Sequence, residues 1–174
     1  MGKQSAGLLL YRRGTGGLEV FLVHPGGPFY RRKDLGVWSV PKGEHEPSED
    51  AVAVALREFS EETGSSLAID RTDLIALGSV TQRSGKIVSV WAASGDLDAS
   101  QINSNTFSIE WPPQSGQTEV FPEVDRAAWF DLDTAKMKLL PAQAAFVDRL
   151  AAVSEPLGTE TDRASPPSGH GQCS

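Results

Sequence analysis

Hydrophobic and polar side chains alternate over several short stretches of the chain, and glycine-rich or polar residues end each stretch. This two-residue period is typical of β-strands, whose successive side chains point to opposite faces of a sheet. Two stretches flank a turn at residues 14–17 and predict a β-hairpin. Two more flank Ser84-Gly85-Lys86 and predict a second hairpin. The expected strands are residues 5–13, 18–24, 36–43, 74–83, 87–93, 107–111 and 128–132.

A helical period replaces the strand pattern at two places in the chain. Residues 49–63 carry apolar side chains one turn apart, which predicts a helix with one face on a core. Ser48 is the expected N-cap, and Gly64 is a typical residue to end the helix. The apolar positions are Ala51, Val52, Ala55, Leu56 and Phe59. Residues 141–153 form the second expected helix, with Pro141 at its start.

The order of these elements predicts the domain organisation. Strands that alternate with helices in a chain of 174 residues indicate one α/β domain, which we place at residues 1–153. Residues 114–122 are expected to form a loop between two strands. From Ser154 onward the composition shifts to Gly, Ser, Thr, Pro and acidic residues, so residues 154–174 are expected to be a disordered tail.

Negative charge is concentrated in residues 43–65, which cover the first expected helix and the loop before it. This stretch holds seven acidic residues and one basic residue, a formal charge of −6. Glu58, Glu61 and Glu62 stand three and four residues apart, so their carboxylates lie on one helix face. A divalent cation would relieve their repulsion, because hard Mg²⁺ prefers carboxylate oxygen. A solvated acidic face is the commoner role of such acids, so the spacing alone leaves both interpretations open.

The residues around these acids form a longer and more specific pattern. It reads Gly43, five residues, Glu49, seven residues, Arg57-Glu58-Phe59, one residue, Glu61-Glu62, one residue and Gly64. This pattern resembles the box of the Nudix hydrolase family, which includes the MutT-like enzymes. The chain departs from the family at Ser65, where an aliphatic residue is usual. The resemblance implies an α/β Nudix fold, with a mixed β-sheet sandwiched between α-helices, and a pyrophosphohydrolase activity.

The resemblance also implies roles for residues of the box. The implied ligands of a divalent metal, Mg²⁺ or Mn²⁺, are Glu58, Glu61, Glu62 and the carbonyl group of Gly43. In the family, the residue that matches Glu61 serves as ligand or general base. The implied catalytic residues are Glu58, Glu61 and Arg57. Arg57 is also expected to pair with Glu49 and to hold the loop against the helix.

Acids beyond the box are candidates for a further ligand or base. Family members often take such an acid from a later loop or strand, and Glu123 stands before the last expected strand. Glu119 is a second candidate, and Glu110 competes with both. A solvated loop carboxylate is the commoner role for each of them, so the sequence leaves this assignment open.

Basic and aromatic residues precede the box. Residues 1–42 carry a formal charge of +5, and residues 25–34 form a loop rich in glycine and proline. The candidates for substrate binding are Tyr30, Arg31 and Arg32 on this loop and Lys42 beside the box. Such side chains suit a nucleobase and phosphates, although an exposed mobile loop is an equally good interpretation of the loop residues. The Pro-Lys-Gly sequence around Lys42 resembles Nudix enzymes that act on dinucleoside polyphosphates.

Two residues near this loop are expected to have no catalytic part. His24 follows the second expected strand, and a surface histidine at a strand end is the favoured interpretation. Trp38 lies close before the box and is expected to be a packing residue. Neither residue type at these positions predicts a specific chemistry.

The composition argues against several classes of protein. A net charge of −7 and a pI near 4.9 argue against general nucleic-acid binding. No apolar run is long enough to predict a membrane span, and the first residues lack a signal-like apolar stretch. Cys173 is the single cysteine, so a cytoplasmic location is expected. The sequence leaves the oligomeric state open.

Two functions from different classes remain at this point. The favoured one is metal-dependent hydrolysis of a phosphoanhydride bond in a nucleoside diphosphate-linked compound, either a dinucleoside polyphosphate or a nucleoside triphosphate. The alternative is a non-catalytic sensor that keeps the fold and binds a nucleotide. Intact Glu58, Glu61 and Glu62 favour the hydrolase, because sensors of this kind often lose acids of the box. Either function predicts a small nucleotide as the partner.

Overall fold

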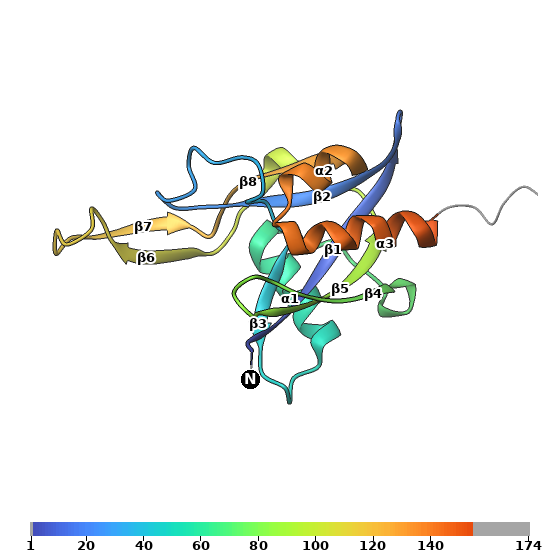
Figure 1. The fold of residues 1–174 in the computed structure, drawn as a ribbon, viewed down its shortest axis with the longest axis horizontal. Helices are drawn as coiled ribbons and strands as arrows, with labels where there is room; N and C mark the ends of the chain where they lie inside the picture. Colours follow the sequence, from blue (N-terminus) through green and yellow to red (C-terminus); the bar gives the residue numbers. More distant parts are fainter. Residues whose placement is uncertain (1, 155–174) are drawn as a thin grey trace, which may run out of the picture.

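A mixed β-sheet forms the centre of the fold (Figure 1). The computed structural model describes residues 2–154. The sheet has six strands in the order β4-β5-β1-β2-β8, and β3 pairs with β1 beside this path. Its strands are β1 (Gln4–Gly14), β2 (Gly17–Pro25), β3 (Lys42–His45), β4 (Ile75–Thr81), β5 (Ile87–Ser94) and β8 (Val124–Asp131). Strands β6 (Thr106–Glu110) and β7 (Thr118–Pro122) form a separate antiparallel ribbon.

The long strand β1 has a different set of partners on each of its edges. On one edge it pairs in parallel with β5 from Gln4 to Tyr11. On the other edge its first residues, 4–7, pair with β3, and its last residues, 11–14, pair with β2. Strands β3 and β2 therefore share one edge of β1, one after the other. Residues 26–41 connect these two strands, and we call this segment the β2–β3 connection.

Helices cover both faces of the sheet, which confirms the predicted sandwich. The helices are α1 (Ala51–Thr63), α2 (Leu132–Lys138) and α3 (Ala144–Ser154), with 3₁₀ turns at Arg71–Asp73, Ala99–Gln101 and Pro141–Gln143. Phe59 of α1 packs in one core with Leu8 of β1. Phe146 of α3 packs in the other core with Leu9. Successive residues of β1 thus enter opposite cores, as the period of a strand requires.

Helix α1 begins two residues later than predicted. Ser48 lies in a turn before the helix, and Asp50 is the N-cap. The Asp50 carboxylate accepts hydrogen bonds from two backbone N–H groups of the first turn, at 3.0 and 3.4 Å, and also suits the positive end of the helix dipole. Val54 is buried where the prediction placed Val52. The predicted end is confirmed, because Gly64 adopts a left-handed conformation with φ of 70°.

The prediction of a loop over residues 114–122 is wrong, because Thr118–Pro122 form strand β7. This strand pairs with β6 from Glu110 opposite Thr118 to Thr106 opposite Pro122. The rings of Phe107 and Phe121 pack together with centroids 6.1 Å apart. The resulting ribbon projects from the body of the protein (Figure 1). The hairpin escaped prediction because only one apolar side chain of β7, Phe121, is buried.

The predicted strand over residues 36–43 is also displaced. The regular strand is β3, which covers Lys42–His45. Trp38 and Ser39 form only isolated bridges, to Leu139 and Val23. Both predicted hairpins are confirmed, and Pro141 opens a 3₁₀ turn before the last helix rather than the helix itself.

Two further expectations concern the chain as a whole. Within residues 2–154, the structure contains no helix with the length and hydrophobicity of a membrane span. Ser154 closes α3, whereas it was expected to begin the tail. The rest of the predicted tail, residues 155–174, lies outside the described residues.

The core between α3 and the sheet leads to a test of the fold. Phe146 is fully buried, whereas Val153 on the same helix is 51% exposed. The substitution Phe146→Ala leaves a cavity, so we expect the free energy of unfolding to fall by about 3–5 kcal/mol in urea titrations. The control Val153→Ala is expected to change it by about 0.5 kcal/mol or less. Equal losses in the two variants would contradict this placement of α3.

Candidate active site

The acids on one face of α1 lie against the start of β3. The Oε2 atom of Glu62 accepts a hydrogen bond from the backbone N–H of Lys42 at 3.2 Å. One turn earlier, the carboxylate of Glu58 lies directly against Gly43, where any Cβ atom would overlap it. Glycine at this position therefore lets a helix carboxylate approach the backbone of β3. The third acid, Glu61, is more exposed, at 42% of its side chain.

Arg57 gathers three acids of this stretch. Its guanidinium nitrogens lie 3.8 Å from Glu49, 3.5 Å from Glu58 and 3.9 Å from Glu61. The expected pair with Glu49 is therefore present, and it ties the loop before α1 to the helix. The Arg57 side chain is half exposed and these contacts are long, so each contributes less than about 1 kcal/mol to stability. The main effect of Arg57 is to offset negative charge beside the box acids.

Charges at the junction of α1 and β3 are partly withdrawn from water. Burial raises the pKa of Glu62 to about 8, and the nearby charge and backbone N–H of Lys42 offset this effect only in part. Burial also lowers the pKa of the Lys42 ammonium group below its usual range. The pKa of Glu58 is raised by burial and by the neighbouring carboxylate of Glu61. An additional positive charge at this place would favour the ionised form of both acids.

These groups adjoin a pocket of about 210 Å³. Its walls are Val23, Pro25, Tyr30, Val37, Ser39, Lys42, Glu62, Glu123, Val124 and Leu140. The structure thus brings together Tyr30, Lys42, Glu62 and Glu123, which stand far apart in the sequence. The carboxylate of Glu123 also contributes to the raised pKa of Glu58 and Glu62, which places it within electrostatic reach of the box. Apolar walls with a few convergent polar groups are typical of a small-molecule site.

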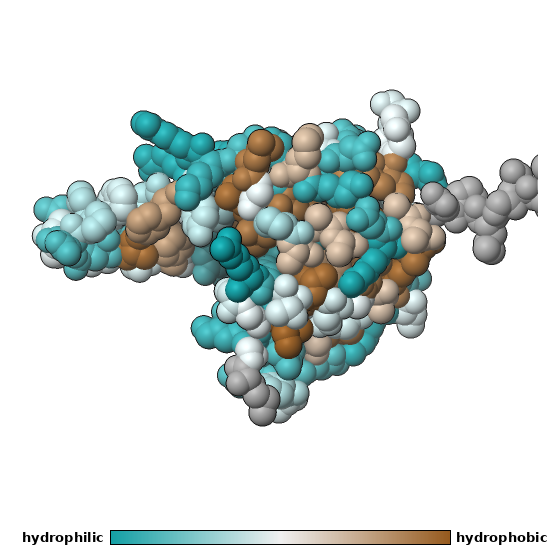
Figure 2. All heavy atoms as spheres, in the orientation of Figure 1, coloured by the Kyte–Doolittle hydropathy of each residue, from teal (hydrophilic) through white to brown (hydrophobic). Residues whose placement is uncertain are grey.

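Other candidate residues lie outside the walls of this pocket. Arg31 and Arg32 are exposed in the β2–β3 connection, close in sequence to Tyr30. Figure 2 shows hydrophilic side chains that project from this part of the molecule. Glu119 lies opposite Ile109 in the ribbon, and Glu110 lies on the same ribbon. The structure therefore brings Glu123, but not Glu119, to the pocket.

The chemistry of the donor set fits a hard divalent cation. The carboxylates of Glu58, Glu62 and Glu123 and the carbonyl group of Gly43 supply oxygen ligands of the kind that Mg²⁺ and Mn²⁺ prefer. Within residues 2–154, however, no three acidic, histidine or cysteine side chains form a closed set of ligands. The acids instead turn to other partners, because like charges repel. Glu58 and Glu61 face Arg57, and Glu62 accepts from the backbone of Lys42.

The expectation of a surface histidine at position 24 is wrong. The His24 side chain is fully buried, and its ring packs edge-on against Trp38 with centroids 5.1 Å apart. Its Nδ1 atom lies 2.8 Å from Oδ1 of Asp125, and its Nε2 atom lies 2.7 Å from the carbonyl oxygen of Lys33. Asp125 is 101 residues away in the sequence, so only the pairing of β2 with β8 reveals this contact. The packing role expected for Trp38 is confirmed, because this side chain is buried.

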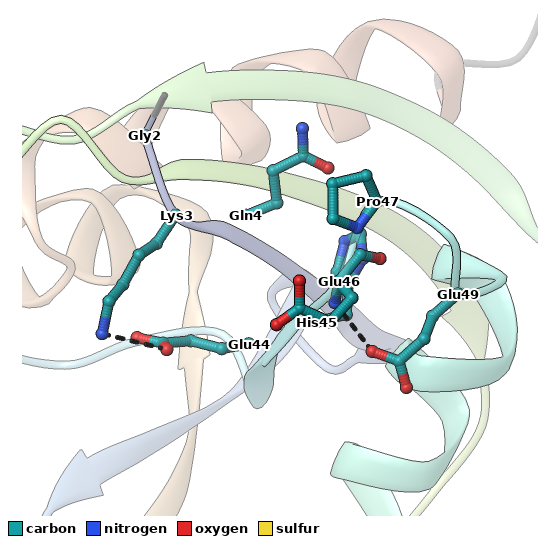
Figure 3. A pocket seen from close by; sticks show the side chains of 8 residues that line it. All are labelled: Gly2, Lys3, Gln4, Glu44, His45, Glu46, Pro47 and Glu49. Atoms are coloured by element: carbon teal, nitrogen blue, oxygen red, sulfur yellow. Dashed lines mark hydrogen bonds and ion pairs between the residues drawn. The ribbon is translucent and has the colours of Figure 1, made fainter.

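A second hollow lies at the other end of β3 and encloses about 490 Å³ (Figure 3). Its walls are Gly2, Lys3, Gln4, Glu44, His45, Glu46, Pro47 and Glu49. Lys3 pairs with Glu44 at 3.3 Å, and the backbone N–H of Glu46 donates to Glu49 at 2.7 Å. Lys3, Glu44 and Glu49 are therefore engaged with other groups, and none of the three α1 acids lines this hollow. The smaller pocket is the better candidate for chemistry.

The raised pKa of Glu62 predicts how stability depends on pH in the metal-free protein. An unfolded chain loses this proton near pH 4.5, whereas the folded chain keeps it up to about pH 8. Between these values the folded state binds more protons, so the free energy of unfolding should fall as pH rises. We expect urea titrations in a chelator to show this fall, and Glu62→Gln to reduce it. Equal slopes in the parent and the variant would contradict the burial of this carboxyl group.

Comparison with known proteins agrees with this geometry. The family model of the NUDIX domain matches residues 1–150. A search of curated proteins found no match. Among solved structures, the Ap4A hydrolase of C. elegans in a binary complex is similar at a TM-score of 0.55 and 22% identity, over 87% of this chain and 96% of that one.

Two other structures show how widely this fold is shared. The MutT protein of Methanosarcina mazei Go1 aligns at a TM-score of 0.58 and 17% identity, over 88% of this chain and 96% of that one. The NUDIX domain of Shewanella oneidensis NrtR, complexed with ADP ribose, aligns at a TM-score of 0.58 and 16% identity, over 88% of each chain. Identities this low establish the fold alone. The match of the family model to residues 1–150, which include the box, shows that the chain belongs to the Nudix family and supports its assignment as a pyrophosphohydrolase of the Nudix type.

Proposed function

We propose that this protein uses a divalent metal to cleave a phosphoanhydride bond in a nucleoside diphosphate-linked compound. The observation that carries the proposal is the meeting of Glu62, Lys42 and Glu123 in one pocket beside Glu58. Partly buried acids are unfavourable unless a positive charge compensates them, and Lys42 offsets Glu62 only in part. A cation and a phosphorylated substrate together would supply the missing compensation.

The proposed ligands follow from the donor set. Glu58, Glu62 and the carbonyl group of Gly43 would hold Mg²⁺ or Mn²⁺, with Glu61 of the same helix face as a further ligand and Glu123 as an additional acid. When bound, the cation neutralises phosphate oxygens and lowers the pKa of a water molecule. We assign the role of proton acceptor to Glu61, the most exposed acid of the α1 face. Arg57 offsets the charge of Glu58 and Glu61 before substrate binds.

The basic residues around the pocket favour a substrate with several phosphate groups. Lys42 lies in the pocket wall, and burial leaves its ammonium group poorly hydrated, which strengthens its attraction for a phosphate oxygen. Arg31 and Arg32 lie beyond the wall, next to Tyr30, which offers a ring for stacking on a base. We therefore favour dinucleoside polyphosphates or nucleoside triphosphates over nucleotide sugars. The similarity to an Ap4A hydrolase is consistent with this class.

Two further parts of the proposal concern the surroundings of the enzyme. The substrate is a small nucleotide, and the net charge of −7 makes nucleic acid an unfavourable partner. We place the enzyme in the cytoplasm, because a chain with a single cysteine cannot form the internal disulfides that are common in oxidising compartments. The alternative is a non-catalytic sensor, and the following test distinguishes it from the hydrolase.

The hydrolase proposal is tested by removing charge from the box without changing its size. Glu58→Gln and Glu62→Gln are each expected to lower kcat/KM by at least about a hundred-fold, because they weaken metal binding and charge stabilisation together. Purified protein with Mg²⁺ is incubated with a panel of nucleoside triphosphates, dinucleoside polyphosphates and nucleotide sugars, and the hydrolysis products are separated and quantified. The control is Asp133→Asn, which removes a fully exposed charge on α2. Binding of a nucleotide by the parent without any turnover would favour the sensor.

The preference for several phosphate groups is tested at Lys42. Lys42→Ala is expected to raise KM more for diadenosine tetraphosphate than for a nucleoside diphosphate sugar, by about ten-fold, because the longer chain needs more positive charge. The parent should also show a steeper loss of affinity with added salt for the tetraphosphate. An equal effect on both substrates, with faster turnover of the sugar, would refute the preference but not the hydrolase assignment.

A further inference from the structure

The buried ring of His24 faces a hydrogen-bond acceptor on each side. Nδ1 lies 2.8 Å from the carboxylate oxygen of Asp125, and Nε2 lies 2.7 Å from the carbonyl oxygen of Lys33. A carbonyl oxygen and an ionised carboxylate cannot donate, so both ring nitrogens must carry a proton for both bonds to form. One buried ring therefore bridges β2, β8 and the β2–β3 connection.

Each residue joined by this ring is close in sequence to a wall of the pocket. Pro25 follows His24 directly, and Val124 precedes Asp125 directly. Lys33 is linked to Tyr30 by a turn, in which the backbone N–H of Lys33 donates to the carbonyl oxygen of Tyr30 at 2.9 Å. The His24 ring thus joins three segments that each carry a residue of the wall.

The β2–β3 connection depends on side chains at its middle. Its two ends are held by backbone hydrogen bonds, from Gly26 to Glu123 at 2.9 Å and from Gly36 to Met137 at 3.0 Å. Between them, Phe29 packs edge-on against Trp111 of the β6–β7 turn at 5.4 Å, and Asp34 pairs with Lys138. Phe29 and Leu35 are 59% and 67% exposed. The hydrogen bond between His24 and Lys33 differs from these contacts, because the His24 side chain is fully buried.

We propose that His24 is a positioning residue whose buried ring holds the β2–β3 connection over the pocket, with Tyr30 in the pocket wall. This inference rests on the proposed function only in treating the pocket as the nucleotide site. Loss of the ring, or of its partner Asp125, releases the connection and with it Tyr30.

The charged groups near the ring have partners of their own. The Arg126 guanidinium lies 4.0 Å from the Asp125 carboxylate and 5.5 Å from the Trp38 ring centroid. Asp34 accepts from the indole N–H of Trp38 at 2.9 Å and also binds Lys138 of α2. The Lys33 ammonium group lies over the ring of Tyr30, 5.4 Å from its centroid. The Asp125 carboxylate is therefore the charged group in direct contact with the His24 ring.

The first test needs no substrate. Backbone hydrogen exchange is measured for residues 29–35 relative to the surface turn at residues 82–86. In His24→Gln, relative exchange should exceed that of the parent by at least about ten-fold, because the hydrogen bond from the buried ring is lost. Asp125→Asn, which keeps the size of the partner but removes its charge, should change exchange in the same direction.

The control for these variants is Asp148→Asn, which removes an exposed ion pair between Lys136 of α2 and Asp148 of α3. Its exchange should match that of the parent. Exchange at residues 29–35 that neither His24→Gln nor Asp125→Asn changes would overturn the proposal. Because Asp125 is only partly buried, this variant is expected to fold even if His24→Gln does not.

The second test separates positioning from chemistry. For the panel compound that the parent hydrolyses fastest, Asp125→Asn should raise KM by about ten-fold at neutral pH while kcat stays within about two-fold. A fall in kcat with an unchanged KM would overturn the positioning role. If no compound of the panel is hydrolysed, the proposed function fails by itself, and the exchange experiment still decides the role of His24.

Discussion

A carboxylate that is partly withdrawn from water is the constraint on which the site depends. Glu62 sits where α1 meets β3, and its surroundings raise its pKa to about 8 because burial outweighs the help of Lys42. Such a group is tolerated only where the scaffold leaves it no other position. Packing of Phe59 and Val54 fixes α1 on the sheet, and the helix period then fixes the direction of Glu62. The free-energy cost of burying Glu62 therefore follows from how the whole helix packs on the sheet.

The pairing of β1 explains why the pocket forms where it does. Strands β3 and β2 follow one another along the same edge of β1. The chain between them must therefore bridge the space between the end of β2 and the start of β3. That chain is the β2–β3 connection, and it brings Tyr30 to the same pocket as Lys42. Gly43 completes the arrangement, since a side chain there would displace the carboxylate of Glu58. The sheet and α1 therefore supply one part of the site, and the β2–β3 connection supplies another.

Features that depend on local sequence were predictable, and those that depend on distant pairing were not. The acids of α1 share a face because of spacing alone, and Gly64 ends the helix because it adopts positive φ. The contact of His24 with Asp125 requires the register of β2 against β8, which no local pattern encodes. Strand β7 was missed because its neighbour is β6 rather than the core, so its side chains carry little hydrophobic signal. Ser48 and Asp50 are both good N-caps, and only the turn at residues 46–49 decides between them.

The size of the pocket limits how a substrate can bind. At about 210 Å³ it is smaller than the roughly 300–1,000 Å³ typical of sites that enclose a whole ligand. A dinucleoside polyphosphate would therefore place only part of itself between Lys42 and Glu123, and the rest would lie over the surface beside the pocket. The surface on that side is the β2–β3 connection, with exposed Arg31 and Arg32. Under the proposed function, Arg31 and Arg32 would contact the part of a long anionic substrate that the pocket does not enclose.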